Sequence, residues 1–271
     1  MSTGMGTRLR KKPGSRASEQ YQYGPVVGVR TTVGIVVRMP PSWFPDELAY
    51  AGPEHLDPGF VAGYDRKQGF PPVDADVDVL RSLGALGSDA VVVDMGTGTG
   101  RFAMAAARHC ARVIAVDVSP AMLGHLREAA ASAGLANVEV VRAGFLSYEH
   151  TGADADAVHT RNALHQLPDF WKGIALQRIA QILRPGGVLR LHDLVYDVTP
   201  ADAPALLDDW LGQAQDDPET GYTADDFITH IRTEFSTYRW LLEPLLQATG
   251  FDIVDVEVHR QIYAAYTCVK R

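Results

Sequence analysis

The chain has few of the features that mark secreted, zinc-binding or membrane proteins. Its 271 residues include two cysteines, Cys110 and Cys268, which are too few for a disulfide framework or a zinc site. No run of 18 apolar residues occurs, and the basic residues near the start are not followed by the apolar segment of a signal peptide. We therefore expect a cytoplasmic protein that binds no metal ion and does not enter a membrane.

Acidic residues are scarce at the N-terminus, where the positive charge is concentrated. The first 38 residues carry seven basic residues against Glu19, a net charge of +6, which leaves −14 for the other 233 residues of a chain with net charge −8. Residues 1–38 lack apolar periodicity, so we predict a basic, disordered tail or a start codon placed too early. The acidic body and the absence of interleaved basic and aromatic residues disfavour a nucleic-acid partner.

What the chain does have is a glycine-rich turn after a buried strand. Residues 91–93 are all valine, and Asp94 then precedes Gly96, Gly98 and Gly100. Glycine allows a tight strand-to-helix turn, and its bare backbone lets a ligand lie against the N–H groups at the helix start. The run therefore predicts a nucleotide-cofactor site.

A second strand with an acidic end follows at the spacing such a site needs. Residues 112–117 (Arg-Val-Ile-Ala-Val-Asp) predict a largely apolar strand that ends in Asp117. Asp117 lies 17 residues after Gly100, where a carboxylate can bind ribose hydroxyls. Residues 102–110 favour a helix, and Ser119 with Pro120 predicts the start of another that runs to Ala133. The chain thus alternates strand and helix.

The glycines alone do not choose between cofactor classes. The dinucleotide pattern Gly-x-Gly-x-x-Gly counted from Gly96 requires a small residue at position 101, which is arginine. Counted from Gly98, the looser version of the pattern fits, with Ala103 as its last residue. The neighbouring motifs have to decide.

Those motifs resemble the class I S-adenosylmethionine-dependent methyltransferases. They are Asp94 with the glycine run, Asp117, the segment 156–165 (Asp-Ala-Val-His-Thr-Arg-Asn-Ala-Leu-His) and the segment 183–189 (Leu-Arg-Pro-Gly-Gly-Val-Leu), and they span about residues 90–194. The resemblance is to the small-molecule, type 11/25-like branch, which includes quinone-biosynthesis methyltransferases. It implies S-adenosyl-L-methionine as the cofactor. It also implies a Rossmann-like, doubly wound α/β sheet of seven strands, mainly parallel, with the last strand reversed.

The resemblance also implies where the cofactor binds. The glycines would contact its amino-acid part, Asp94 would act near its ammonium through the loop, and Asp117 would bind the ribose. The full set implied is Asp94, Gly96, Thr97, Gly98, Gly100, Asp117, Val118, Met122, Gly144, Phe145, Asn162 and Tyr64. The family often has an acid after the third strand that binds the adenine amino group, but the segment 142–145 (Arg-Ala-Gly-Phe) has none. Backbone N–H groups and stacking by Phe145 or Leu146 are the expected replacement.

The remaining pattern completes the sheet and adds a lid. Short apolar runs at 138–142, 155–160 and 188–194 predict three further strands, residues 169–183 a helix, and residues 251–258 with 261–269 a terminal hairpin. Between Tyr196 and Gly250, about 55 residues stand where the family needs one crossover helix. Residues 204–215, a helix starting at Thr223, and a crossover helix within 235–249 fill this insertion.

We expect five parts. They are the tail 1–38, an N-terminal helical cap 39–85, a cofactor-binding core 86–195, a helical lid 196–235, and a crossover helix with the C-terminal hairpin, 236–271. Ten aromatic residues of the cap and of the insertion 196–250 are expected to cover the strand ends where an acceptor binds: Trp43, Phe44, Tyr50, Phe60, Tyr64, Trp210, Tyr222, Phe227, Tyr238 and Trp240.

Methyl transfer needs a nucleophile held close to a sulfonium methyl, water excluded, and a proton removed where one must leave. The candidate bases are His165, and His192 with Asp193, because histidine titrates near neutrality. Arg161, Trp210 and Tyr238 are candidates for substrate binding, with Arg161 holding an anionic group. Tyr64 is expected to close over the cofactor.

The sequence therefore predicts an enzyme that methylates a small, largely apolar acceptor, on oxygen or carbon rather than nitrogen. Two alternatives remain: an RNA or protein methyltransferase that uses the basic arm, and a non-catalytic cofactor-binding module. Homodimerisation is left open.

Overall fold

The computed structural model describes residues 29–30, 36–37, 41–69, 73–218 and 221–271, in two compact units, Met1–Pro45 and Asp46–Arg271. In the first unit, β1 (Val29–Arg30) pairs antiparallel with β2 (Val36–Val37). Most of the predicted basic tail lies outside the described residues. No helix of the described part is both long and apolar enough to cross a membrane.

The second unit is built on one sheet with the strand order β5-β4-β3-β6-β7-β10-β9. The strands are β3 (Val91–Met95), β4 (Arg112–Asp117), β5 (Val138–Arg142), β6 (Ala155–Arg161), β7 (Leu183–Tyr196), β9 (Phe251–His259) and β10 (Tyr263–Lys270). Strands β3 to β7 pair in parallel, and β10 runs antiparallel to both β7 and β9. This confirms the predicted α/β sheet of seven strands with one strand reversed. The two-residue strand β8 (Thr237–Tyr238) adds to the end of β7.

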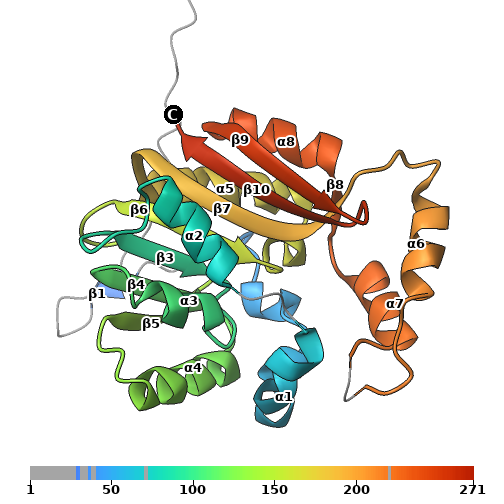
Figure 1. Cartoon of the computed structure of the whole chain (residues 1–271), viewed down its shortest axis with the longest axis horizontal. Coiled ribbons are helices and arrows are strands. Elements are labelled where there is room, and N and C mark those ends of the chain that lie inside the picture. The colour runs from blue at the N-terminus through green and yellow to red at the C-terminus, as the bar shows by residue number, and fades with distance from the viewer. Residues whose placement is uncertain (1–28, 31–35, 38–40, 70–72, 219–220) are drawn as a thin grey trace, which may run out of the picture. The chain divides into compact units, whose positions relative to one another are not determined.

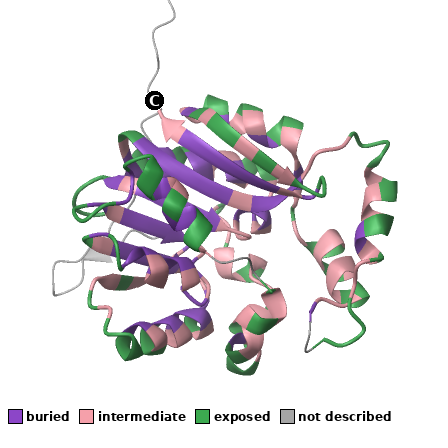
Figure 2. Cartoon of the chain, viewed as in Figure 1, coloured by how far each residue is buried: buried purple, intermediate pink, exposed green. Residues whose placement is uncertain are grey.

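Helices cover both faces of this sheet (Figure 1), with α2 (Asp74–Ser82) and α3 (Arg101–Ala106) on one face and α5 (Asp169–Ile182) and α8 (Arg239–Ala248) on the other. The central strands are buried almost throughout, as Figure 2 shows. Parallel strands buried on both faces need near-continuous apolar runs, which is why β3 and β4 could be predicted from the sequence. Helix α4 (Pro120–Ser132) begins as predicted, with the Ser119 hydroxyl accepting from the Met122 N–H.

Several predicted boundaries were wrong. Helix α3 ends at Ala106 rather than at Cys110, and the helix predicted over 204–215 is α6 (Ala203–Leu211). The fifth strand begins at Leu183 instead of Val188, because the Pro-Gly-Gly segment is taken into β7 as an irregularity of its pairing with β6. The predicted hairpin forms, but β9 and β10 are joined by residues 260–262 rather than by the expected two-residue turn 259–260. Two non-glycine residues of this turn have positive φ, Arg260 at 53° and Gln261 at 57°.

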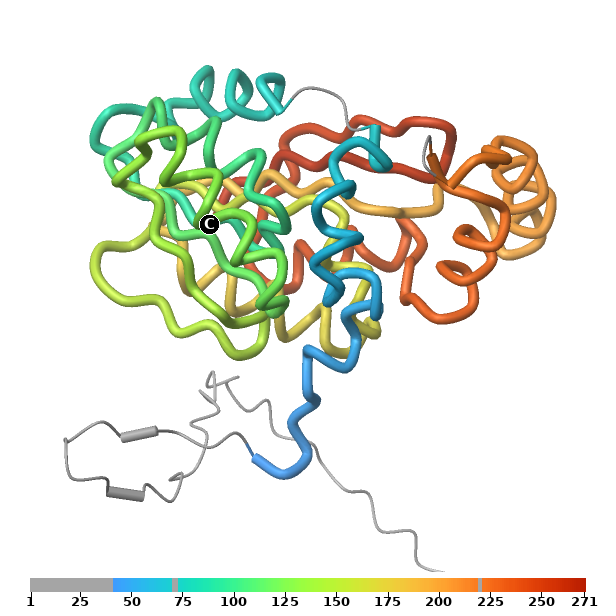
Figure 3. Tube along the Cα trace, turned by 90° about the horizontal axis from the view of Figure 1, so that it is seen from below, coloured from blue at the N-terminus to red at the C-terminus, as the bar shows by residue number. Residues whose placement is uncertain are grey.

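The lid and helix α1 (Pro58–Gln68) lie beside each other at the carboxyl ends of the strands. Helices α6 and α7 (Ala224–Thr233) extend to one side of the sheet, and α1 lies between them and the core in both Figure 1 and Figure 3. Thr223 and Asp226 form the capping box of α7. Lys67 of α1 forms an ion pair with Asp226 of the lid at 3.1 Å, so this contact joins α1 to the lid. Two short 3-10 helices, η1 (Glu47–Tyr50) and η2 (Pro53–Leu56), precede α1, and a third, η3 (Leu164–Gln166), follows β6.

A buried ionic cluster fixes α2 to the sheet. Asp76, which is fully buried, accepts hydrogen bonds from Arg161 (2.9 Å) and Arg190 (2.9 Å) and contacts His192 Nε2 at 2.6 Å. The carboxylate oxygen that accepts from Arg161, Oδ2, also lies 3.5 Å from His159 Nε2. Burial raises the pKa of Asp76, but the hydrogen bonds and charges of the two histidines outweigh it and hold the pKa far below its usual value. Asp76 is therefore a buried anion whose four partners come from two neighbouring strands.

We expect Asp76→Asn to lower the free energy of unfolding by about 3–5 kcal/mol, because it leaves buried cations without their counter-charge. The matched control is Asp78→Asn, two residues along the same helix, where an exposed carboxylate lies 3.8 Å from Arg81. It should change stability by no more than about 0.5 kcal/mol. Urea unfolding of both variants measures the difference, and equal effects would contradict the role given to Asp76.

The same variant should alter the acid limb of the stability profile. A carboxylate whose pKa is lowered by folding stabilises the protein above its unfolded pKa of about 3.9 and loses that contribution as the pH falls further. The wild type should therefore lose stability more steeply below about pH 4 than Asp76→Asn does. Unfolding measured from pH 7 to pH 2 provides the comparison.

Candidate functional site

The glycine run forms the tight turn that the sequence predicted at the end of β3. The N–H groups of Gly96 and Thr97 both donate to Val116 O at the end of β4, at 2.8 and 2.9 Å. Gly96 has φ of +70°, and a Cβ there would lie 2.4 Å from the Cβ of Ala163. Gly100 has φ of +82°, and a Cβ there would lie 2.0 Å from Leu126. Side chains are therefore excluded at both positions by backbone conformation and by close packing.

Asp117 holds this turn from the neighbouring strand. One carboxylate oxygen accepts from the Gly98 N–H and the other from the Ser119 N–H, both at 2.8 Å. Burial raises the pKa of Asp117, and the two N–H groups oppose that effect. Each oxygen keeps a lone pair beyond these bonds, so Asp117 can still accept from hydroxyl groups of a ligand.

Asp94, at the end of β3, holds the turn through a hydrogen bond. Its side chain accepts from the Thr97 hydroxyl at 2.6 Å and contacts His159 Nδ1 at 2.7 Å, and its exposed fraction is 2%. The ring of His159 stacks on Phe102, with centroids 3.6 Å apart. Asp94 is therefore a buried positioning residue whose interactions lie within the protein.

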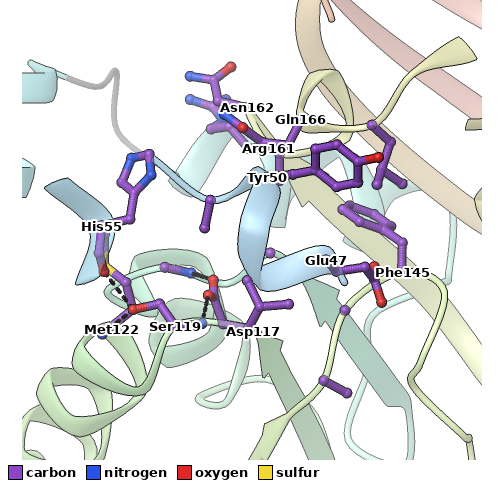
Figure 4. Close-up of a pocket in the computed structure, with 18 of the residues that line it drawn as sticks. Glu47, Tyr50, His55, Asp117, Ser119, Met122, Phe145, Arg161, Asn162 and Gln166 are labelled. Atoms are coloured by element: carbon purple, nitrogen blue, oxygen red, sulfur yellow. Dashed lines mark hydrogen bonds between the residues drawn. The ribbon is translucent and has the colours of Figure 1, made fainter. Parts of the chain in front are cut away.

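A pocket opens above the turn, between the strand ends and the segment η1–α1 (Figure 4). Nine of the twelve residues predicted to bind the cofactor line it: Tyr64, Gly96, Gly98, Asp117, Val118, Met122, Gly144, Phe145 and Asn162. Asp94, Thr97 and Gly100 are not among the lining residues. Arg161, predicted as a substrate ligand, lines the same pocket, together with Tyr50, Gln166 and Leu167. Gly96 and Asn162, which are 66 positions apart in the sequence, are thus brought to one cavity.

A carboxylate that the sequence analysis missed also lines this pocket. Glu47 of η1 accepts from the Leu146 N–H at 3.0 Å and from the Ser147 hydroxyl at 2.7 Å. A Cβ on Gly144 would lie 2.2 Å from a Glu47 carboxylate oxygen, so this side chain fills the space over Gly144. Burial raises the pKa of Glu47, and the bonds from Leu146 and Ser147 oppose that effect. A carboxylate thus lies over the segment 142–145, which has no acid of its own, and it comes from a segment about 100 residues away.

The end of β6 reaches the pocket through a strained residue. Asn162 has φ of +49°, a conformation that non-glycine residues adopt rarely, and its N–H donates to His192 O at 2.9 Å. Arg161 donates to Asp76 on the far side of the pocket wall. The buried ionic cluster therefore orients Arg161.

The candidate bases occupy two different environments. His165, in η3, contacts Asp193 Oδ1 through Nδ1 at 2.5 Å and Glu234 Oε2 through Nε2 at 3.0 Å. Burial alone would lower the pKa of His165, but the two carboxylates outweigh that effect and raise the pKa to about 9. His192 belongs to the Asp76 cluster, where burial lowers its pKa to about 4 against the effect of Asp76. Neither imidazole lines the pocket, although Gln166, which does, contacts His165 Nε2 at 3.2 Å.

The aromatic cover is distributed more widely than predicted. Tyr50 and Tyr64 line the pocket, but Trp210 is packed inside the lid, stacked on Phe227 with centroids 4.5 Å apart. Tyr238 stacks on Trp240, whose exposed fraction is 52%, and it does not line the pocket. Trp43 and Phe44 belong to the unit Met1–Pro45. The structure therefore brings Arg161, but not Trp210 or Tyr238, to the cavity.

Residues 92–187 match the family model described as a methyltransferase domain. Similar solved structures include a SAM-dependent methyltransferase from Aquifex aeolicus, with 19% identity and a TM-score of 0.54 over 79% of this chain and 99% of that one. Magnesium protoporphyrin IX methyltransferase from Synechocystis PCC 6803, solved with bound SAM, has 14% identity and a TM-score of 0.58 over 85% of this chain and 100% of that one.

The [4+2]-cyclase SpnF is a further similar structure, with 18% identity and a TM-score of 0.55 over 73% of this chain and 80% of that one. At these identities the three structures establish the fold. Because a protein described as a cyclase shares that fold, the residues around the pocket have to carry the functional argument.

Proposed function

We propose that this chain is an S-adenosylmethionine-dependent methyltransferase that methylates a small, largely apolar acceptor on oxygen or carbon. Support comes from the match of residues 92–187 to the methyltransferase domain model and from the fold shared with a methyltransferase solved with bound SAM. When bound, the cofactor supplies an electrophilic methyl group on a sulfonium sulfur. The observation that carries the proposal is the convergence of nine predicted cofactor residues on one pocket.

The residues present fit such a cofactor at both ends of the pocket. Gly98 has φ of +54° and no atom within 4 Å of a Cβ position, so the turn leaves open space for a ligand beside its backbone. In our proposal, Asp117 accepts from the ribose hydroxyls. Glu47 accepts from the adenine amino group, in place of an acid at position 144.

The acceptor class follows from the lining of the pocket and its neighbours. Tyr50, Tyr64 and Leu167 give the wall an apolar and aromatic character, which suits a small molecule with few charges. An oxygen or carbon acceptor has to release a proton, and we place the exit of that proton on the side of the pocket formed by Gln166, which contacts His165. His192 is left out of this role because Asp76 holds its ring within the ionic cluster.

The cofactor assignment is tested by calorimetric titration of S-adenosylhomocysteine and NAD into the wild type and Asp117→Ala. Losing a hydrogen-bonding carboxylate should cost roughly 1.5–3 kcal/mol, about 10- to 150-fold in affinity for S-adenosylhomocysteine. Asp154→Ala, which removes an exposed acid, is the matched control and should bind as the wild type does. Binding of NAD alone, or of neither ligand, would contradict the proposal.

The role of Glu47 is tested by ligand selectivity. The wild type should bind S-adenosylhomocysteine more tightly than S-inosylhomocysteine, in which a carbonyl oxygen replaces the amino group and would face the carboxylate. Glu47→Ala should weaken S-adenosylhomocysteine binding by roughly 10-fold or more, since a hydrogen bond to a charged group is lost. It should leave S-inosylhomocysteine binding unchanged or make it tighter, because the carboxylate that faces the carbonyl oxygen is gone.

Two further variants complete the Glu47 test. Glu128→Ala removes an exposed acid on α4 and should preserve the selectivity. Combining Glu47→Ala with Gly144→Asp should restore part of it, because the new carboxylate enters the space that Glu47 vacates. Unchanged selectivity in Glu47→Ala would place the adenine elsewhere.

A further inference from the structure

Four titratable side chains meet where the lid docks on the sheet, and we call them the His165 cluster: His165, Asp193, His230 and Glu234. They come from η3, from β7, and from α7 with the residue that follows it. The exposed side-chain fractions are 5% for His165, 3% for Asp193, 14% for His230 and 16% for Glu234. The cluster is therefore largely shielded from water and joins the lid to the core.

Three of these residues present ligand atoms to one point. One nitrogen each of His165 and His230 and a carboxylate oxygen of Glu234 all lie within 4.8 Å of one another. The two imidazole rings have centroids 5.2 Å apart and planes tilted by 60°. Two imidazoles bound to one tetrahedral ion, with metal–nitrogen distances of about 2.0–2.1 Å, place their centroids about 5 Å apart. The arrangement therefore has the dimensions of a metal site.

The other ring nitrogens have partners of the kind that orient metal-binding histidines. His165 Nδ1 contacts Asp193 Oδ1, and the second oxygen of Asp193 accepts from the His165 backbone N–H at 2.9 Å. His230 Nε2 contacts the Ser236 hydroxyl at 2.9 Å. With the protons on these outer nitrogens, His165 Nε2 and His230 Nδ1 both present lone pairs toward Glu234.

The carboxylates of the cluster have imidazoles as their partners. Asp193 and Glu234 are two largely buried carboxylates, and no lysine or arginine of the described residues forms a salt bridge with either of them. Glu234 Oε2 is buried, and the atoms it contacts are the two imidazole nitrogens, His165 Nε2 at 3.0 Å and His230 Nδ1. A divalent ion would take the place of the protons between these imidazoles and Glu234 and would balance the two carboxylates.

We propose that His165, His230 and Glu234 bind a divalent transition-metal ion of the zinc class, with Asp193 orienting His165 from outside the coordination shell. Two histidines and one carboxylate suit zinc and its neighbours, whereas magnesium and calcium prefer all-oxygen sites. Three protein ligands leave a coordination position open, as in catalytic rather than structural zinc sites.

The site lies next to the pocket through two residues. Gln166 contacts His165 and lines the pocket, and Phe235, which follows Glu234, packs edge-on against Tyr50 of the pocket wall with centroids 5.8 Å apart. Resting on the proposed function, the open position would bind the acceptor hydroxyl or its enolisable oxygen and ease its loss of a proton. Metal binding itself does not depend on that function.

The test is metal binding by the full chain after treatment with a chelator, followed by titration with Zn²⁺ and with Co²⁺ as a spectroscopic probe. The wild type should bind one equivalent, and its Co²⁺ form should show the strong visible absorption of a four- or five-coordinate ion. His230→Ala and Glu234→Gln should weaken binding at least 10-fold. Asp193→Asn should weaken it by about 10- to 100-fold, because it loses the group that orients His165.

His109→Ala is the matched control, because it removes an exposed histidine outside the cluster and should bind the metal as the wild type does. Far-ultraviolet circular dichroism and S-adenosylhomocysteine titration of each variant separate loss of the metal site from loss of the fold. The proposal is overturned if the wild type binds no stoichiometric metal, or if His230→Ala and Glu234→Gln bind it as tightly as the wild type. S-adenosylhomocysteine binding that persists in that case would leave the proposed function intact.

Discussion

The site depends on the tight turn from β3 to α3. Gly96 and Gly100 both have positive φ, and the space beside each is already filled, by Ala163 at the end of β6 and by Leu126 of α4. The turn can therefore close only if the backbone approaches both neighbours without side chains. This close approach places the Gly98 N–H on Asp117 and leaves a cavity above the strand ends. Every other feature of the pocket is arranged around that fixed loop.

Two sides of the cavity have different origins. The side next to the sheet is built from the ends of β3, β4 and β6, whose positions follow from parallel pairing. The opposite side comes from η1 and α1, and Lys67 of α1 pairs with Asp226 of the lid. The sheet side suits a cofactor common to many proteins, whereas the added segments can set the acceptor. This division explains why sequence motifs indicate the cofactor, whereas the acceptor is proposed only from the residues that line the pocket.

The sheet and the cofactor loop could be predicted from the sequence because their signals are local. Apolar runs ending in Asp94 and Asp117, glycines at fixed spacing, and Ser119 before Pro120 each act over a few residues. Glu47, Asp76 and Glu234 escaped prediction because their roles arise from contacts across the fold. Glu47 meets Ser147 at a separation of 100 residues, and Asp76 meets His192 at 116. A charged residue in a short helix carries no sign that it will be buried, and only the packing of α2 on the sheet makes Asp76 an internal anion.

The central claim is that this pocket holds S-adenosylmethionine between the Gly96–Gly100 turn and the Glu47 segment. A crystal structure of the full chain with S-adenosylhomocysteine tests it most directly. The account predicts ribose hydroxyls on the Asp117 carboxylate and the adenine amino group within hydrogen-bond distance of Glu47. A ligand bound outside the pocket, or one whose ribose lies away from Asp117, would contradict it.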